Sequence, residues 1–151
     1  MHHDNQHKGI KMRRILIFLT VIAVFSFAGC SSWSDSDSKA AALAAADAWL
    51  PLVDSENYTG SWENSAKLFQ AAVSKEQWVQ AMEGARKPLG RNISRKLKSK
   101  EYHTSMPGAP DGKYVVIKFA ASFENKKNAI ETVTPMLDTD GTWRVSGYYM
   151  K

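Results

Sequence analysis

The chain has 151 residues, of which 44% are hydrophobic and 23% charged, and its formal net charge is +5. Four of the 20 basic and one of the 15 acidic residues precede Cys30, which leaves a net charge of only +2 for the 121 residues that follow. This balance gives no support to nucleic-acid binding, which requires a basic surface. A segment of 121 residues provides for one domain with one core, and not for two.

An apolar segment near the start of the chain predicts export. Four basic residues between Lys8 and Arg14 precede an uncharged, mostly apolar run at 15–27. Such a run forms a helix of only about 20 Å, which is too short to span a bilayer core. A signal peptide over 1–29 fits this length. The residues at 27–30, Phe-Ala-Gly-Cys, resemble the lipobox of bacterial lipoproteins.

Cys30 is the only cysteine of the chain, whereas small exported proteins normally use cysteines in pairs. Lipidation of Cys30 explains the single thiol, with an uncleaved membrane anchor as the alternative. We therefore expect a lipid anchor, a lipidated cysteine with a polar tether at 30–38, and a single domain at 39–151. Ser31 after the cysteine, rather than an aspartate, indicates the periplasmic face of the outer membrane if the host is Gram-negative.

The first helix of the domain is predicted at 39–53, where apolar residues recur at helical spacing in an alanine-rich segment. Either Asp37 or Ser38 can cap its start. Pro51 has no backbone N–H, so this helix should kink or end near Leu50.

Two further helices are predicted before Gly90. An apolar stripe that includes Trp62 and Phe69 indicates a helix at 61–73. Ser74 and Gln77 then have the spacing of a capping box, which starts a third helix that ends near Arg86. The residues of this helix that we expect to face inward are Trp78, Met82 and Ala85.

Beyond Gly90 the spacing of apolar residues changes from the 3.6-residue period of a helix to the 2-residue period of a strand. Apolar residues alternate from Val115 to Phe123, and turn residues gather at 107–112 and 138–141. Four antiparallel strands joined as a meander are predicted at 91–105, 113–124, 128–138 and 142–150. Three N-terminal helices packed on a curved four-stranded antiparallel sheet make an α+β fold, for which we expect a cystatin-like or nuclear-transport-factor-2-like cone.

Several motifs of this segment are shared with one family. They are 45–50 (AADAWL), 74–78 (SKEQW), 95–97 (RKL), 107–112 (PGAPDG), 114–117 (YVVI), Phe119, 123–127 (FENKK), 131–136 (ETVTPM) and 141–149 (GTWRVSGYY). With them the chain resembles the bacterial domain-of-unknown-function 4019 family over about residues 40–151. The resemblance implies an exported or lipid-anchored envelope domain of cone fold, and it implies no known activity.

No residue pattern singles out a catalytic or metal site, and we predict no catalytic residue, metal or cofactor. His103 lies on a predicted strand, where a lone histidine more often packs or meets solvent than acts as a base. The aspartates at 111, 138 and 140 lie in predicted turns. Glu131 is the one acid on a strand that merits a test as a catalytic group, and we expect it to be exposed.

The aromatic residues leave two classes of function open. Nine tryptophans and tyrosines between Trp49 and Tyr149 could stack on a ligand, but their spacing fits a core between helices and sheet more simply. The first class is a non-catalytic binding or scaffolding lipoprotein, and the second is a small-ligand-binding or enzymatic cone. A filled interior would favour the first class, and an open pocket with a titratable side chain the second.

A basic segment at 86–100 contains seven lysines and arginines and no acid. On a regular strand, Lys96, Lys98 and Lys100 project from one face as a row about 7 Å apart. We expect a solvated face that discourages edge pairing, with contact to anionic lipid or an acidic envelope protein as the alternative. The predicted partners are thus the membrane, an envelope protein and, through the sheet face, a second copy of the chain, and they include no nucleic acid.

Overall fold

The structure, a computed structural model, describes residues 34–151. Its elements are α1 (Asp35–Asp54), α2 (Tyr58–Glu63), α3 (Lys67–Ala72), α4 (Lys75–Ala85), the short 3₁₀ helix η1 (Lys87–Leu89), β1 (Asn92–His103), β2 (Tyr114–Phe123), β3 (Ala129–Leu137) and β4 (Trp143–Met150). The strands form one antiparallel sheet in the order β1-β2-β3-β4, as expected for a meander. The predicted α+β class and all four strands are confirmed, with strand ends within two residues of the predicted ones.

Helix α1 begins four residues earlier than predicted. Ser34 is its N-cap and forms a capping box with Asp37, while Asp35 and Asp37 place negative charge in the first turn. The predicted cap at Asp37 or Ser38 is therefore wrong, and the segment 35–38 belongs to the helix and not to a tether. Ser38 is fully buried in this first turn.

The helix also continues past Pro51 to Asp54, so of the two alternatives predicted near Leu50, a kink or an end, the end is wrong. A proline inside a helix removes one hydrogen bond, and burial of the flanking apolar residues can outweigh that loss. Leu50 and Val53 are both almost completely buried, and the N–H of Ser55 donates to the carbonyl of Pro51 at 3.0 Å.

The single helix predicted at 61–73 is two short helices, α2 and α3, separated at 64–66. Asn57 caps α2 by accepting from the N–H of Gly60. Between the two helices, the N–H of Ala66 donates to the carbonyl of Val145 on β4 at 2.8 Å. The chain therefore leaves the helical path because its backbone bonds to the edge of the sheet.

Helix α4 confirms the capping box of Ser74 and Gln77 and the inward placement of Trp78 and Met82. Ala85 is exposed, so its predicted inward placement is wrong. The next residue, Arg86, is the buried one, with an exposed fraction of 3%.

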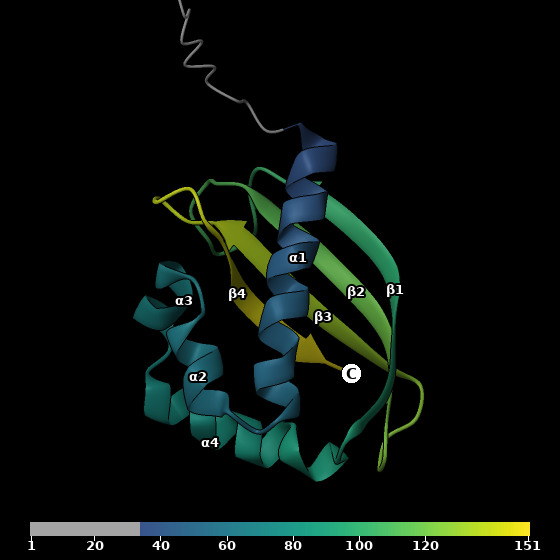
Figure 1. Cartoon of the computed structure of the whole chain (residues 1–151). Helices are drawn as coiled ribbons and strands as arrows, with labels where there is room; N and C mark the ends of the chain where they lie inside the picture. Colours follow the sequence, from purple (N-terminus) through teal and green to yellow (C-terminus); the bar gives the residue numbers. More distant parts are fainter. Residues whose placement is uncertain (1–33) are drawn as a thin grey trace, which may run out of the picture. The chain divides into compact units, whose positions relative to one another are not determined.

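Helix α1 lies across one face of the sheet, and α2, α3 and α4 lie beside it toward β4 (Figure 1). The alternation predicted for β2 is confirmed, since Val115, Ile117 and Phe119 face α1 in the main core. The core also contains Trp49 and Trp78, whose rings lie 6.2 Å apart. Most of the aromatic residues thus serve the core, as expected, whereas Tyr149 is 63% exposed. Residues 34–151 hold a complete core of their own, the property of an independently folding domain.

Candidate functional site

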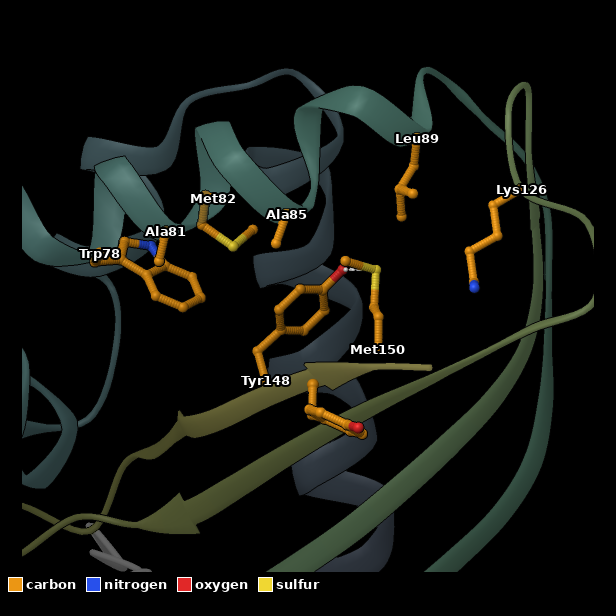
Figure 2. Close-up of a pocket in the computed structure, with 9 residues that line it drawn as sticks. Trp78, Ala81, Met82, Ala85, Leu89, Lys126, Tyr148 and Met150 are labelled. Atoms are coloured by element: carbon orange, nitrogen blue, oxygen red, sulfur yellow. Dashed lines mark hydrogen bonds between the residues drawn. The ribbon is translucent and has the colours of Figure 1, made fainter.

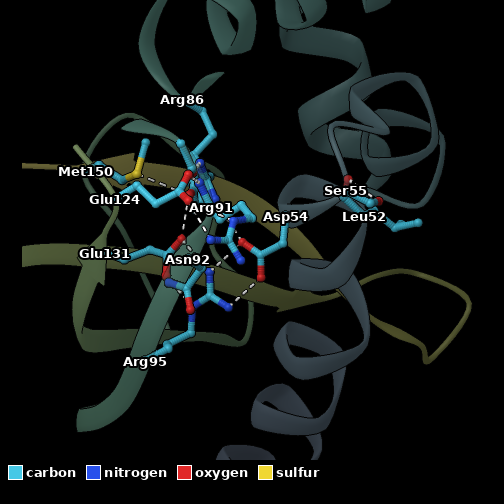
Figure 3. A network of polar contacts seen from close by, with 12 residues as sticks. Leu52, Asp54, Ser55, Arg86, Arg91, Asn92, Arg95, Glu124, Glu131 and Met150 are labelled. Carbon is cyan, nitrogen blue, oxygen red and sulfur yellow. Dashed lines mark hydrogen bonds and ion pairs between the residues drawn. The ribbon is translucent and has the colours of Figure 1, made fainter. Parts of the chain in front are cut away.

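A network of ion pairs joins the end of α1 to the sheet (Figure 3). Arg95 on β1 donates from both terminal nitrogens to Asp54, the last residue of α1, at 2.8 and 3.0 Å. It also donates from Nε to Glu131 Oε2 on β3 and from Nη2 to Glu131 Oε1 at 3.1 Å. One arginine thereby connects a helix to two strands that are not neighbours.

Arg86, directly after α4, completes the network. It donates to Asp54 Oδ1 at 3.0 Å and to the carbonyl of Gly90 at 2.8 Å, and its guanidinium lies 4.4 Å from the ring centre of Phe123. Two arginines thus face two carboxylates, so the network is internally neutral. Charges this far from water require such pairing.

The protonation states in the network are fixed by their surroundings. Burial by itself opposes the charged form of Arg95, but hydrogen bonds to Asp54 and Glu131 outweigh it and raise the pKa of Arg95. Burial likewise opposes the charge of Asp54, and the bonds from Arg95 and Arg86 overcome it and lower the pKa of Asp54. The pKa of Tyr148 is raised by burial and by the negative charge of Glu131. Tyr148 is therefore a protonated hydroxyl that donates to Glu131 Oε1.

Glu131 has an exposed fraction of 0%, so the prediction that it is exposed is wrong. Its place in the alternation was the available signal, because it shares the inward face of β3 with Ala129 and Val133. Both of its carboxylate oxygens already accept hydrogen bonds from Arg95 or Tyr148. A general base needs an oxygen free to take a proton from a substrate. The network therefore positions elements of the fold and does not present a base.

Next to this network an open groove separates α4 from the end of β4 (Figure 2). It has a volume of about 320 Å³. Its lining is mostly apolar and comes from Trp78, Ala81, Met82 and Ala85 on one side, from Tyr148, Tyr149 and Met150 on the other, and from Leu89 and Lys126. Tyr148 contributes to both features, since its ring lines the groove while its hydroxyl bonds to Glu131.

The predicted lysine row does not form. A bulge at Lys98 shifts the register of β1, so that Lys96 pairs with Ala120 and Lys100 with Ile117. Ala120 is on the exposed face of β2 and Ile117 on the buried one, so Lys96 and Lys100 lie on opposite faces. The basic segment as a whole is not a solvated face either. Two of its arginines, Arg86 and Arg95, are paired in the buried network.

The other candidate residues lie apart from the groove. His103 is partly exposed at the end of β1. Asp138 is buried, pairs with Arg144 at 3.0 Å and accepts from the N–H of Lys67, while Asp140 pairs with Arg144 in the same turn. Cys30 and the predicted signal peptide at 1–29 lie outside the described residues.

No group of three or more histidine, cysteine, aspartate or glutamate side chains within 34–151 is arranged to hold a metal ion. Among the helices of this same segment, none combines the length and the apolar character needed to cross a membrane.

Fold and site together define a small α+β domain with an internally neutralised charge network beside an apolar groove. A family model described as "Protein of unknown function (DUF4019)" matches residues 45–148. The chain belongs to this family, as its motifs predicted. No curated protein and no solved structure gives a match.

Proposed function

We propose that the chain is a lipid-anchored cell-envelope protein whose domain binds a small apolar ligand, without catalysis, in the groove between α4 and β4. In a Gram-negative host its place is the periplasmic face of the outer membrane. The lipobox-like residues before Cys30 support the anchor, as does the absence of any other cysteine from the sequence.

A nuclear-transport-factor-2-like cone is part of the same proposal. Its support is the antiparallel meander with α1 laid across one face and three short helices beside it (Figure 1). In such an arrangement a ligand site lies between the helices and the sheet, and a groove between α4 and the end of β4 is consistent with that.

The observation that carries the binding function is the groove itself. The space between α4 and the end of β4 is open and mostly apolar, whereas a second hollow, of about 340 Å³ between α1 and β4, is lined in part by the polar side chains of Asn64, Thr142 and Arg144. Ligand pockets are concave, mostly apolar and about 300 to 1,000 Å³ in volume, with few polar groups. Trp78, Met82 and Met150 give the groove that character. Glu131, the carboxylate that accepts from the groove residue Tyr148, has both oxygens paired, which favours binding over chemistry.

Nile red, a neutral apolar dye, tests this function on residues 34–151. We expect saturable binding with enhanced fluorescence. Ala85→Trp should abolish most of it, because Ala85 is exposed on α4 and lines the groove, so that an indole there occupies the site without disturbing the core. Gln80→Trp is the matched control, since Gln80 is exposed on the same helix but does not line the groove. Equal dye binding by the two variants would refute the proposed site.

A further inference from the structure

The groove has a single cationic side chain on its rim. Lys126 lies in the turn between β2 and β3, is partly buried and lines the groove. It forms no ion pair with any carboxylate of residues 34–151. Its neighbour Lys127 differs, because its ammonium donates to the carbonyl of Phe123 at 3.0 Å.

The groove is polar at one end only. Lys126 and Trp78 lie at opposite ends of it, with Met82, Ala85 and Met150 between them (Figure 2). The amine of Lys126 points from its turn toward the groove. A ligand that fills this space therefore meets an apolar surface along its length and a cation at one end.

The groups beneath the groove do not cancel the charge of Lys126. Glu131 is neutralised by Arg95, and Tyr148 stays an uncharged hydroxyl because burial raises its pKa. The charge that a ligand meets in the groove is thus that of one ammonium, which attracts an anion and repels a second cation.

We infer that the ligand is a single-chain amphiphile with a carboxylate head, such as a medium-chain fatty acid. Its head pairs with Lys126 and its chain extends toward Trp78. This inference rests on the proposed binding function and names the ligand class. A carboxylate accepts a short charge-assisted hydrogen bond from a lysine, and methionines adapt to a flexible chain. A volume of about 320 Å³ is at the lower limit for ligand pockets, which favours one chain over the two of a phospholipid.

Three amphiphiles with the same chain and different heads test the inference on residues 34–151. They are sodium dodecanoate, dodecyl maltoside and dodecyltrimethylammonium, each titrated calorimetrically below its micellar concentration. We expect dodecanoate to bind most tightly and to displace Nile red. Lys126→Gln should weaken dodecanoate binding about tenfold, the effect of one lost bond between charged partners, and should leave the neutral amphiphile unaffected. The matched control Lys127→Gln should bind all three as the unmodified domain does.

The outcomes separate the ligand class from the site. Dodecanoate binding that is no tighter than that of the other two, or that does not change in Lys126→Gln, overturns the inference while Nile red binding upholds the groove. If neither Nile red nor any of the three amphiphiles binds, both the proposed groove and the inferred ligand class are overturned. Dodecanoate binding that persists in Ala85→Trp shows that the anion binds elsewhere and overturns the inference as well.

Discussion

Arg95 and Glu131 form an ion pair that crosses the strand between them. Arg95 is on β1 and Glu131 is on β3, and Arg95 Nε lies 2.5 Å from Glu131 Oε2. The β2 residue that pairs with Arg95 is Ala121, which pairs in turn with Ala129. These two methyl side chains leave room for a guanidinium to lie over β2, so the edge strand β1 is joined to β3 as well as to its neighbour.

We predict strong coupling between these two residues in stability. Glu131→Leu should lower the free energy of unfolding by about 3 to 5 kcal/mol, because it leaves Arg95 buried with half of its charge partners. Arg95→Met should lower the free energy of unfolding by a similar amount, because it leaves the carboxylate of Glu131 buried without its cationic partner. The double variant should recover much of the loss, since a buried pair replaced by apolar residues is often nearly neutral. Urea denaturation of all four proteins measures the coupling, and simple additivity of the two losses would contradict it.

Asp54 should make the domain sensitive to acid. Its pKa is lower in the folded state than in the unfolded chain, despite burial, because Arg95 and Arg86 bond to it. The folded state therefore binds fewer protons near the unfolded pKa of about 3.9, and the stabilisation present at neutral pH is lost as pH falls through the folded pKa.

The test is the urea midpoint of the unmodified domain and of Asp54→Asn between pH 7 and pH 3. Asp54→Asn should be less stable at pH 7, and the difference should narrow below about pH 4. Asp47→Asn serves as control, because Asp47 is exposed on the same helix and forms no ion pair within 34–151. If the urea midpoints of the unmodified domain and of Asp54→Asn differed by the same amount from pH 7 to pH 3, the acid sensitivity would not come from Asp54.

Trp78 and Ser74, four residues apart, should differ in their importance for stability. Trp78 is 7% exposed, packs edge-on against Phe69 and donates to the hydroxyl of Ser61 at 2.9 Å. Trp78→Ala should cost about 3 to 5 kcal/mol through the cavity it leaves. Ser74→Ala should cost only about 1 kcal/mol, because it removes one capping bond at an exposed helix start. Equal shifts in thermal melting would contradict this assignment of the inward face.

In the proposed lipoprotein the thiol of Cys30 would be the acceptor for the diacylglyceryl group, so Cys30→Ala should abolish lipidation. The variant should lose palmitate label and move from the detergent phase to the aqueous phase, since two or three acyl chains hold a protein stably at about 0.8 kcal/mol per buried CH₂. Ser31→Ala is a suitable control that keeps the thiol. Palmitate incorporation that survives in Cys30→Ala would place the label at another site.

The periodicity of the sequence was sufficient to predict the strands of the sheet but not the ion-pair network of Arg95, Arg86, Asp54 and Glu131. The alternation in β2 and the capping box at Ser74 depend on near neighbours, and both are found in the structure. Arg95 and its carboxylate partners are 36 and 41 residues apart. The alternation in β3 indicates that Glu131 lies on the inward face, but nothing local identifies Arg95 as the partner that makes a buried carboxylate tolerable there. The pairing of this acid with Arg95 therefore follows only from the register of the strands.

Two errors in the predicted elements have tertiary causes. The bulge at Lys98 inserts one residue into β1 and reverses the side on which Lys100 lies, which a regular period of two cannot show. The division of the second predicted helix follows from the bond between Ala66 and Val145 on β4. In both places a contact with a distant strand overrides the local pattern. The predicted dimer through the sheet face, and the predicted contact of Lys96, Lys98 and Lys100 with an anionic surface, stay predictions.

The early start of α1 has a consequence for any ligand exchanged with a membrane. Four residues separate Cys30 from the first residue of the helix, Asp35, and the five steps of chain between these two residues reach no further than about 18 Å. A lipid on Cys30 would therefore confine the domain to a thin layer at the bilayer surface. The domain would then stay within reach of amphiphiles that leave the bilayer. Even a groove of weak intrinsic affinity, which also releases its ligand readily, would meet them repeatedly.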